Sequence, residues 1–146
     1  MEAKVSMTSE SHIPEGASIS VRLKISALWV GMLFVFAYGD IFGSFVPGHI
    51  DDIRGGKISG IEITQTFLLA ASVYVAIASL MIFLTLVLRP TVGRWANVVL
   101  PILYVVSIVA SVIGESWVYF WFLSIAEGVL LLLIIWYAWR WPTLYR

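Results

Sequence analysis

Four long apolar stretches occupy most of this 146-residue chain and restrict what it can fold into. They cover residues 25–46, 66–88, 95–114 and 117–139, and each is close to the roughly 20 residues that a helix needs to cross a bilayer. The polar segments between the later stretches are short, which makes consecutive helices antiparallel neighbours. The sequence therefore predicts an all-α polytopic membrane protein, with a four-helix up-down bundle across residues 25–141.

Composition supports this class and excludes others. The chain is 60% hydrophobic and 12% charged, with a mean hydropathy of +0.95, whereas an ordinary soluble domain is about 25% charged. Its formal net charge is zero and it has no basic tract, so nothing in it favours a nucleic-acid partner. It also has no cysteine, which excludes disulfides, thiolate metal sites and covalent haem attachment.

Lysine and arginine are distributed unevenly between the polar segments. The connection after the first stretch holds only Arg54 and Lys57. The N-terminal segment, the connection after the second stretch and the C-terminal segment hold the other seven: Lys4, Arg22, Lys24, Arg89, Arg94, Arg140 and Arg146. By the positive-inside rule both termini are expected in the cytoplasm, with residues 1–24 as a flexible tail and residues 142–146 as a short C-terminus.

The one sizeable polar connection between stretches, residues 47–65, is expected on the opposite side of the membrane. Its glycines at positions 48, 55, 56 and 60 break any long helix, and the segment could cap the bundle. His49, Asp51 and Asp52 lack the defined spacing of a divalent-cation site, so no metal is expected there.

Small and polar side chains follow one edge of each stretch. In the third stretch their steps of four, three, seven and four place them on one helical face, which should line the bundle. Such residues let helices approach and hydrogen-bond to one another. The predicted interior edges are Phe36, Asp40, Gly43 and Ser44; Gln65, Ser72, Ala76 and Ser79; Asn97, Pro101, Tyr104, Ser111 and Glu115; and Ser124, Glu127, Gly128 and Leu131.

Asp40 and Glu127 are the most informative polar residues, because a carboxyl group in hydrocarbon is costly. At 1.5 Å per residue, Asp40 lies roughly 8 Å below the outer boundary and Glu127 lies near the midplane. Since the first and fourth helices of such a bundle are neighbours, we predict that Asp40 and Glu127 share a ligand or proton site with Tyr104 and Ser124. This site is expected to open toward the outer face. The two carboxyls could equally be protonated groups that hold the bundle together.

Short strings run in order from Ser26 to Pro142: S-A-L-W, Y-G-D, G-I-E-I-T-Q, R-W-A-N and I-W-Y-A-W-R-W-P. With them the chain resembles a family of small bacterial four-span membrane proteins classed only as a domain of unknown function. The resemblance implies a bacterial inner-membrane protein, and the family's carboxyl positions fall on Asp40 and Glu127. The family pattern has alanine at Gly39, a difference expected to affect only helix packing.

Arg94 and Asn97, within the R-W-A-N string, are expected at the cytoplasmic start of the third helix. There Arg94 would be an interfacial anchor and Asn97 a polar group at the start of the helix.

Two functional hypotheses follow. The first is a small proton- or cation-coupled transporter, acting alone or as a homo-oligomer, with Glu127 and Asp40 as the coupling site. The second is a non-transporting membrane component whose polar edges hold the bundle or a partner together. Neither catalysis nor a cofactor is expected: haem b would need paired histidines inside the spans, whereas His12 and His49 lie outside them, and no nucleophile–base pair or zinc spacing is present. The expected partner is the lipid bilayer.

Overall fold

The computed structural model describes residues 19–141, which are mostly helical. Four helices are long and apolar enough to cross a membrane: α1 (Val21–Gly43), α3 (Gln65–Val87), α4 (Pro90–Val112) and α5 (Val118–Trp139). A short helix, α2 (His49–Arg54), and an antiparallel hairpin of β1 (Lys57–Ile58) and β2 (Ile61–Glu62) connect α1 to α3. The predicted all-α bundle of four spans is confirmed.

Capping residues set the starts of these helices. The Ser20 hydroxyl accepts the backbone N–H three residues later at the start of α1, and Thr64 does the same for α3. Pro90 takes the first position of α4, where its missing N–H costs nothing. As a result α1 already includes residues 21–24, predicted as tail, and α4 begins five residues before the expected 95. Residues 1–18 of the tail and the C-terminus at 142–146 lie outside the described residues.

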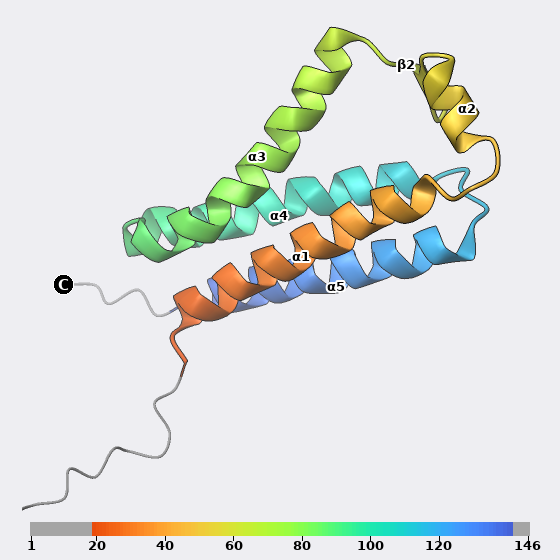
Figure 1. Cartoon of the computed structure of the whole chain (residues 1–146). Coiled ribbons are helices and arrows are strands. Elements are labelled where there is room, and N and C mark those ends of the chain that lie inside the picture. Colours follow the sequence, from red (N-terminus) through yellow and green to blue (C-terminus); the bar gives the residue numbers. More distant parts are fainter. Residues whose placement is uncertain (1–18, 142–146) are drawn as a thin grey trace, which may run out of the picture.

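The long helices form a ring in which α1 lies between α3 and α5, and α5 lies between α1 and α4. The first and fourth spans therefore pack together, as predicted. The backbones of α3 and α4 approach closely only near the short turn that joins them, and farther along α3 tilts away from the other three helices (Figure 1). We call the end with the α3–α4 turn the turn end, and the end with α2 and the hairpin the loop end.

The interior face of α3 is not the one predicted. The predicted edge of Gln65, Ser72, Ala76 and Ser79 is exposed. The hydroxyls of Ser72 and Ser79 donate to backbone carbonyls of their own helix, at 2.8 and 2.9 Å. A serine satisfied in this way needs no partner on another helix. The residues of α3 that turn inward are instead Tyr74, Ala78, Met81 and Thr85.

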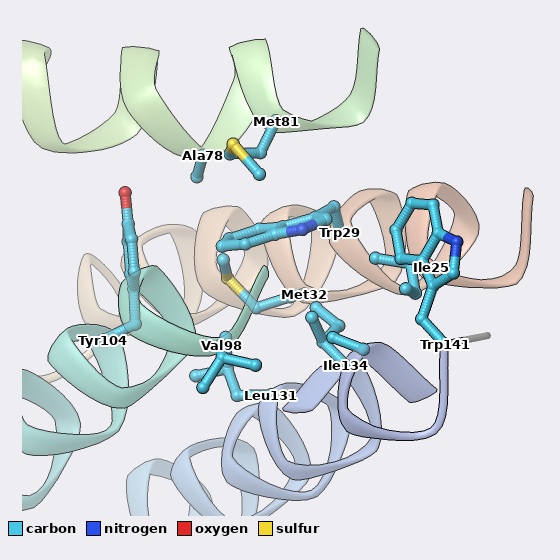
Figure 2. Close-up of a cluster of buried hydrophobic side chains, with 11 residues drawn as sticks. Ile25, Trp29, Met32, Ala78, Met81, Val98, Tyr104, Leu131, Ile134 and Trp141 are labelled. Atoms are coloured by element: carbon cyan, nitrogen blue, oxygen red, sulfur yellow. The ribbon is translucent and has the colours of Figure 1, made fainter. Parts of the chain in front are cut away.

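The packed core lies toward the turn end and is centred on Trp29 of α1, which is fully buried. Figure 2 shows the Trp29 indole between Ala78 and Met81 of α3 on one side and Val98 of α4 on the other. Apolar side chains gain little by leaving lipid for protein, so close packing and hydrogen bonds between helices must hold this core together.

Asn97 belongs to this core and is fully buried, in agreement with its place on the predicted interior edge, but it does not lie at the helix start as predicted. Its Oδ1 accepts hydrogen bonds from Trp29 Nε1 at 2.7 Å and Thr85 Oγ1 at 3.1 Å, and its Nδ2 donates to the Gly93 carbonyl at 2.8 Å. The early start of α4 at Pro90 places Asn97 two turns inside the helix, where it links α1, α3 and α4.

Glycines on α1 allow close contact with α5. A Cβ atom placed on Gly39 would lie 3.7 Å from the Leu123 side chain, and one on Gly43 would lie 3.5 Å from the Tyr119 hydroxyl. Gly39 and Gly43 form a G-x-x-x-G spacing, which is common where membrane helices pack closely. This seam keeps the segment of α1 that carries Asp40 next to α5.

Candidate functional site

A cavity of about 310 Å³ lies between all four long helices, on the loop-end side of the core. It exists where α3 tilts away from its neighbours, and Tyr74 is the α3 side chain that borders it. The other lining residues are Phe36, Gly39 and Asp40 of α1; Ser107, Ile108 and Ser111 of α4; and Phe120, Leu123, Ser124 and Glu127 of α5.

The structure brings three of the four predicted site residues, Asp40, Ser124 and Glu127, onto the wall of this one cavity. Glu127 is buried, with 7% of its surface exposed, whereas Asp40 is exposed toward the loop end. Within residues 19–141 neither carboxyl makes a hydrogen bond or an ion pair. No fully buried side-chain oxygen in that range lacks a partner, so the Glu127 oxygens are accessible from the cavity.

Tyr104, the fourth predicted site residue, does not border the cavity. It is buried one layer deeper, where its hydroxyl donates to the backbone carbonyl of Tyr74 and its ring centroid lies 4.4 Å from that of Tyr74. Tyr74 therefore occupies the place predicted for Tyr104. Its hydroxyl is hydrogen-bonded to Ser107 Oγ at 2.7 Å, which bridges the gap between α3 and α4.

Sequence reasoning did not single out Tyr74. The small residues of α3 suggested a different face, and one tyrosine in an apolar stretch carries no directional signal. The spacing of Tyr74, Ala78, Met81 and Thr85 in steps of four, three and four was the available clue.

A second, larger pocket of about 650 Å³ continues from the cavity toward the loop end. The two share Phe36, Gly39, Asp40 and Phe120, so Asp40 stands at their junction. His49 at the start of α2 and Glu115 also line the outer pocket. This arrangement gives the Glu127 cavity an approach from the loop end that passes Asp40.

Glu115 was predicted on the interior edge of the third helix, but it lies beyond the end of α4. Its Oε1 accepts the backbone N–H groups of Ser116 and Trp117, at 2.8 and 2.9 Å, just before α5. The carboxylate thus satisfies N–H groups at the α5 start and carries a favourable charge for that end of the helix.

Toward the turn end, tightly packed aromatic residues follow the cavity. The Tyr74 ring contacts Tyr104, whose ring centroid lies 5.7 Å from that of Trp29 in an edge-to-face arrangement. Trp29 in turn donates to buried Asn97. Asn97 is therefore part of the layer beneath the cavity, and Arg94 lies one turn nearer the helix start, with its guanidinium 5.6 Å from the Trp139 ring centroid.

The polar groups that line the cavity offer mainly oxygen atoms that can accept hydrogen bonds or bind a cation. Two carboxyls and several hydroxyls face an interior otherwise made of aromatic and aliphatic groups, and no lysine or arginine lines it. Carboxylates and the faces of aromatic rings both attract cations. Among the described residues no group of three His, Cys, Asp or Glu side chains is arranged to hold a metal ion.

Residues 19–144 match the model of a protein family described as "Family of unknown function (DUF6326)". No curated protein and no solved structure matches the chain.

Proposed function

The chain belongs to this family of unknown function, DUF6326, whose description names no activity, and on the basis of the cavity described above we propose that it is a small proton- or cation-coupled membrane transporter. The observation that carries the proposal is the unpaired Glu127 carboxyl, buried between four membrane-capable helices yet accessible from the cavity that Asp40 borders. A carboxyl that only held helices together would be expected to hydrogen-bond to one of them.

Electrostatics supports coupling between a proton and another cation at this place. In a region of low dielectric an isolated carboxylate is strongly disfavoured, so the empty site is expected to hold protons. A cation that enters the cavity stabilises the ionised form and can displace a proton. Because Asp40 and Glu127 border the same cavity, ionising one makes ionising the other less favourable, which limits the negative charge the site can carry at once.

The cavity also has a route for exchange. The outer pocket reaches Asp40 from the loop end, while the Tyr74, Tyr104 and Trp29 rings pack beneath the cavity toward the turn end. Transport would require this aromatic layer to open in a second conformation, as alternating access demands.

The first experiment is chemical labelling of the carboxyls in protein reconstituted into lipid vesicles. Dicyclohexylcarbodiimide, which modifies protonated carboxyls in apolar surroundings, is applied across a pH series, and modified residues are mapped by mass spectrometry. We expect Glu127 to react, to react faster as the pH falls, and to be protected by Na⁺ or by the organic cation tetraphenylphosphonium. Glu62, exposed in the hairpin, serves as the internal control for an ordinary surface carboxyl.

Transport is then tested with an imposed pH gradient across the vesicle membrane. Uptake of the cation that protects Glu127 should depend on the gradient and disappear in Glu127→Gln, while Glu62→Gln should behave as the wild-type chain does. Glu127 could instead stay unreactive at every pH, or react without being protected by a cation and without any cation uptake. Either result would favour a non-transporting component in which the carboxyl serves packing or a partner.

A further inference from the structure

Cationic side chains at the turn end lie over aromatic rings of α5 and of Trp141, just beyond the end of α5. The Arg22 guanidinium carbon lies 5.3 Å from the Trp141 ring centroid, Lys24 Nζ lies 5.5 Å from that of Tyr137, and the Arg140 guanidinium carbon lies 4.6 Å from that of Trp136. Together with the Arg94–Trp139 pair and exposed Arg89, they form what we call the basic collar: Arg22, Lys24, Arg89, Arg94 and Arg140.

The collar has no acidic counterpart in the part of the chain that the structure describes. Every aspartate and glutamate of residues 19–141 lies on the loop-end side of the core: Asp40, Asp51, Asp52, Glu62, Glu115 and Glu127. The one ion pair in that range, between Arg54 and Asp51, is also at the loop end. Five positive charges are therefore gathered at one end of the bundle without a carboxylate from residues 19–141 to balance them.

We propose that the basic collar binds the headgroups of anionic phospholipids. Arginine presents several N–H donors in a fixed plane, a geometry that suits phosphate oxygens. A guanidinium stacked on a tryptophan is held in position without using those donors, so it loses less side-chain freedom on binding. Arg22 uses one donor on the Leu86 carbonyl at 2.7 Å, and this bond ties the collar to the end of α3.

Apolar surface next to the collar identifies the occupant as a lipid and not a free phosphate ion. Large hydrophobic side chains beside the cations are exposed, among them Trp95 at 56% and Trp139 at 60%, which are adjacent in sequence to Arg94 and Arg140. Tryptophan and tyrosine prefer the boundary between headgroups and acyl chains. A lipid bound there would place its phosphate against the collar and its acyl chains along the apolar helix faces.

The test measures lipid binding to the purified full-length chain in detergent by native mass spectrometry. Phosphatidylglycerol is compared with phosphatidylcholine of the same acyl chains, which has the same phosphate but a compensating positive charge. Each basic residue near a charged membrane surface contributes about 1 kcal/mol, or about fivefold in affinity. We expect the double variant R89Q/R140Q to lose phosphatidylglycerol affinity by about 25-fold, with phosphatidylcholine binding unchanged.

The matched control is R54Q/K57Q, which removes the same charge from the loop end and should keep wild-type affinity. R94Q provides an independent single variant, and the thermal stability of each protein in lipid-free detergent confirms that it is folded. The proposal is overturned if both double variants lose affinity equally, if phosphatidylcholine binds as well as phosphatidylglycerol, or if soluble glycerol phosphate displaces the lipid at equal concentration.

Discussion

Asn97 is the residue on which most of the buried polar contacts converge, because its Oδ1 accepts hydrogen bonds from two other helices. Hydrogen bonds between membrane helices contribute about 0.6 kcal/mol on average and up to about 1.7 kcal/mol. Asn97→Leu removes both bonds and leaves the Trp29 and Thr85 donors buried without partners. We expect it to lower the free energy of unfolding by about 1–3 kcal/mol, measured by denaturation in mixed micelles.

Two further variants, Thr85→Val and Ser79→Ala, distinguish the loss of the Asn97 hydrogen bonds from a general loss of polar side chains. Thr85→Val removes only one of the two bonds to Asn97, so its cost should be smaller, at about 0.6–1 kcal/mol. Ser79 is exposed and bonds only to its own helix, so its loss should change little. Equal costs for Asn97→Leu and Ser79→Ala would contradict a structural role for the buried cluster.

The same residues show what the sequence could and could not reveal at this scale. Asp40 and Glu127 were identifiable because a carboxyl inside an apolar stretch is costly wherever it points. The spacing of Asn97 with Pro101 and Tyr104 predicted its interior face, but its depth along the bundle depended on the start of α4 at Pro90, which hydropathy alone does not locate. Tyr104 and Tyr74 are chemically alike, so only their three-dimensional packing determines which of them borders the cavity.

Close packing of α1 against α5 depends on Gly39. An added methyl group would lie 3.7 Å from Leu123, an ordinary contact, and alanine favours the helix by up to about 1 kcal/mol. We therefore expect Gly39→Ala to be neutral or slightly stabilising. Gly39→Leu should cost about 1–3 kcal/mol by overpacking, and it should slow carbodiimide labelling of Glu127 because Gly39 lines the cavity.

Gly128 on α5 provides the comparison for size alone. A Cβ atom placed there meets nothing within 4 Å, so Gly128→Leu should not force α1 and α5 apart. Similar losses in Gly39→Leu and Gly128→Leu would show that the α1–α5 seam is not where the bundle is most tightly constrained.

The tilt of α3 predicts uneven stability along that helix. Its turn-end half contributes buried Ala78, Met81 and Thr85, whereas its loop-end half is largely exposed around Tyr74. Segments with fewer packed contacts open locally at lower free energy. In hydrogen exchange of the detergent-solubilised protein, backbone amides at 68–75 should exchange faster than those at 78–85, and uniform protection along α3 would contradict the tilt.

The interior face of α3 could not be predicted from the sequence for a physical reason. In a soluble helix the buried face is the apolar one, but in α3 the faces toward lipid and toward protein are both apolar. Ser72 and Ser79 suggested the wrong face because their hydroxyls bond within the helix. The lengths of the spans and their antiparallel order, in contrast, follow from bilayer thickness and short connections, which the sequence displays directly.

At the scale of the whole molecule, charge distinguishes the two ends. Residues 19–141 place the five cations of the basic collar at the turn end and only Arg54 and Lys57 at the loop end. Since loops rich in lysine and arginine remain in the cytoplasm, we expect the turn end to face the cytoplasm and the loop end, with the approach to Asp40, to face outward.

The absence of natural cysteine makes this orientation directly measurable. Ser59→Cys in the hairpin and Thr91→Cys at the α3–α4 turn each introduce one thiol at an exposed position. In intact bacterial cells a membrane-impermeant maleimide should label the Ser59→Cys variant at once and the Thr91→Cys variant only after the membrane is permeabilised. The reverse pattern would turn the cavity toward the cytoplasm, so a transporter of this architecture would take up its cation from inside the cell. Labelling of both thiols in intact cells would contradict the prediction that all four helices span the membrane.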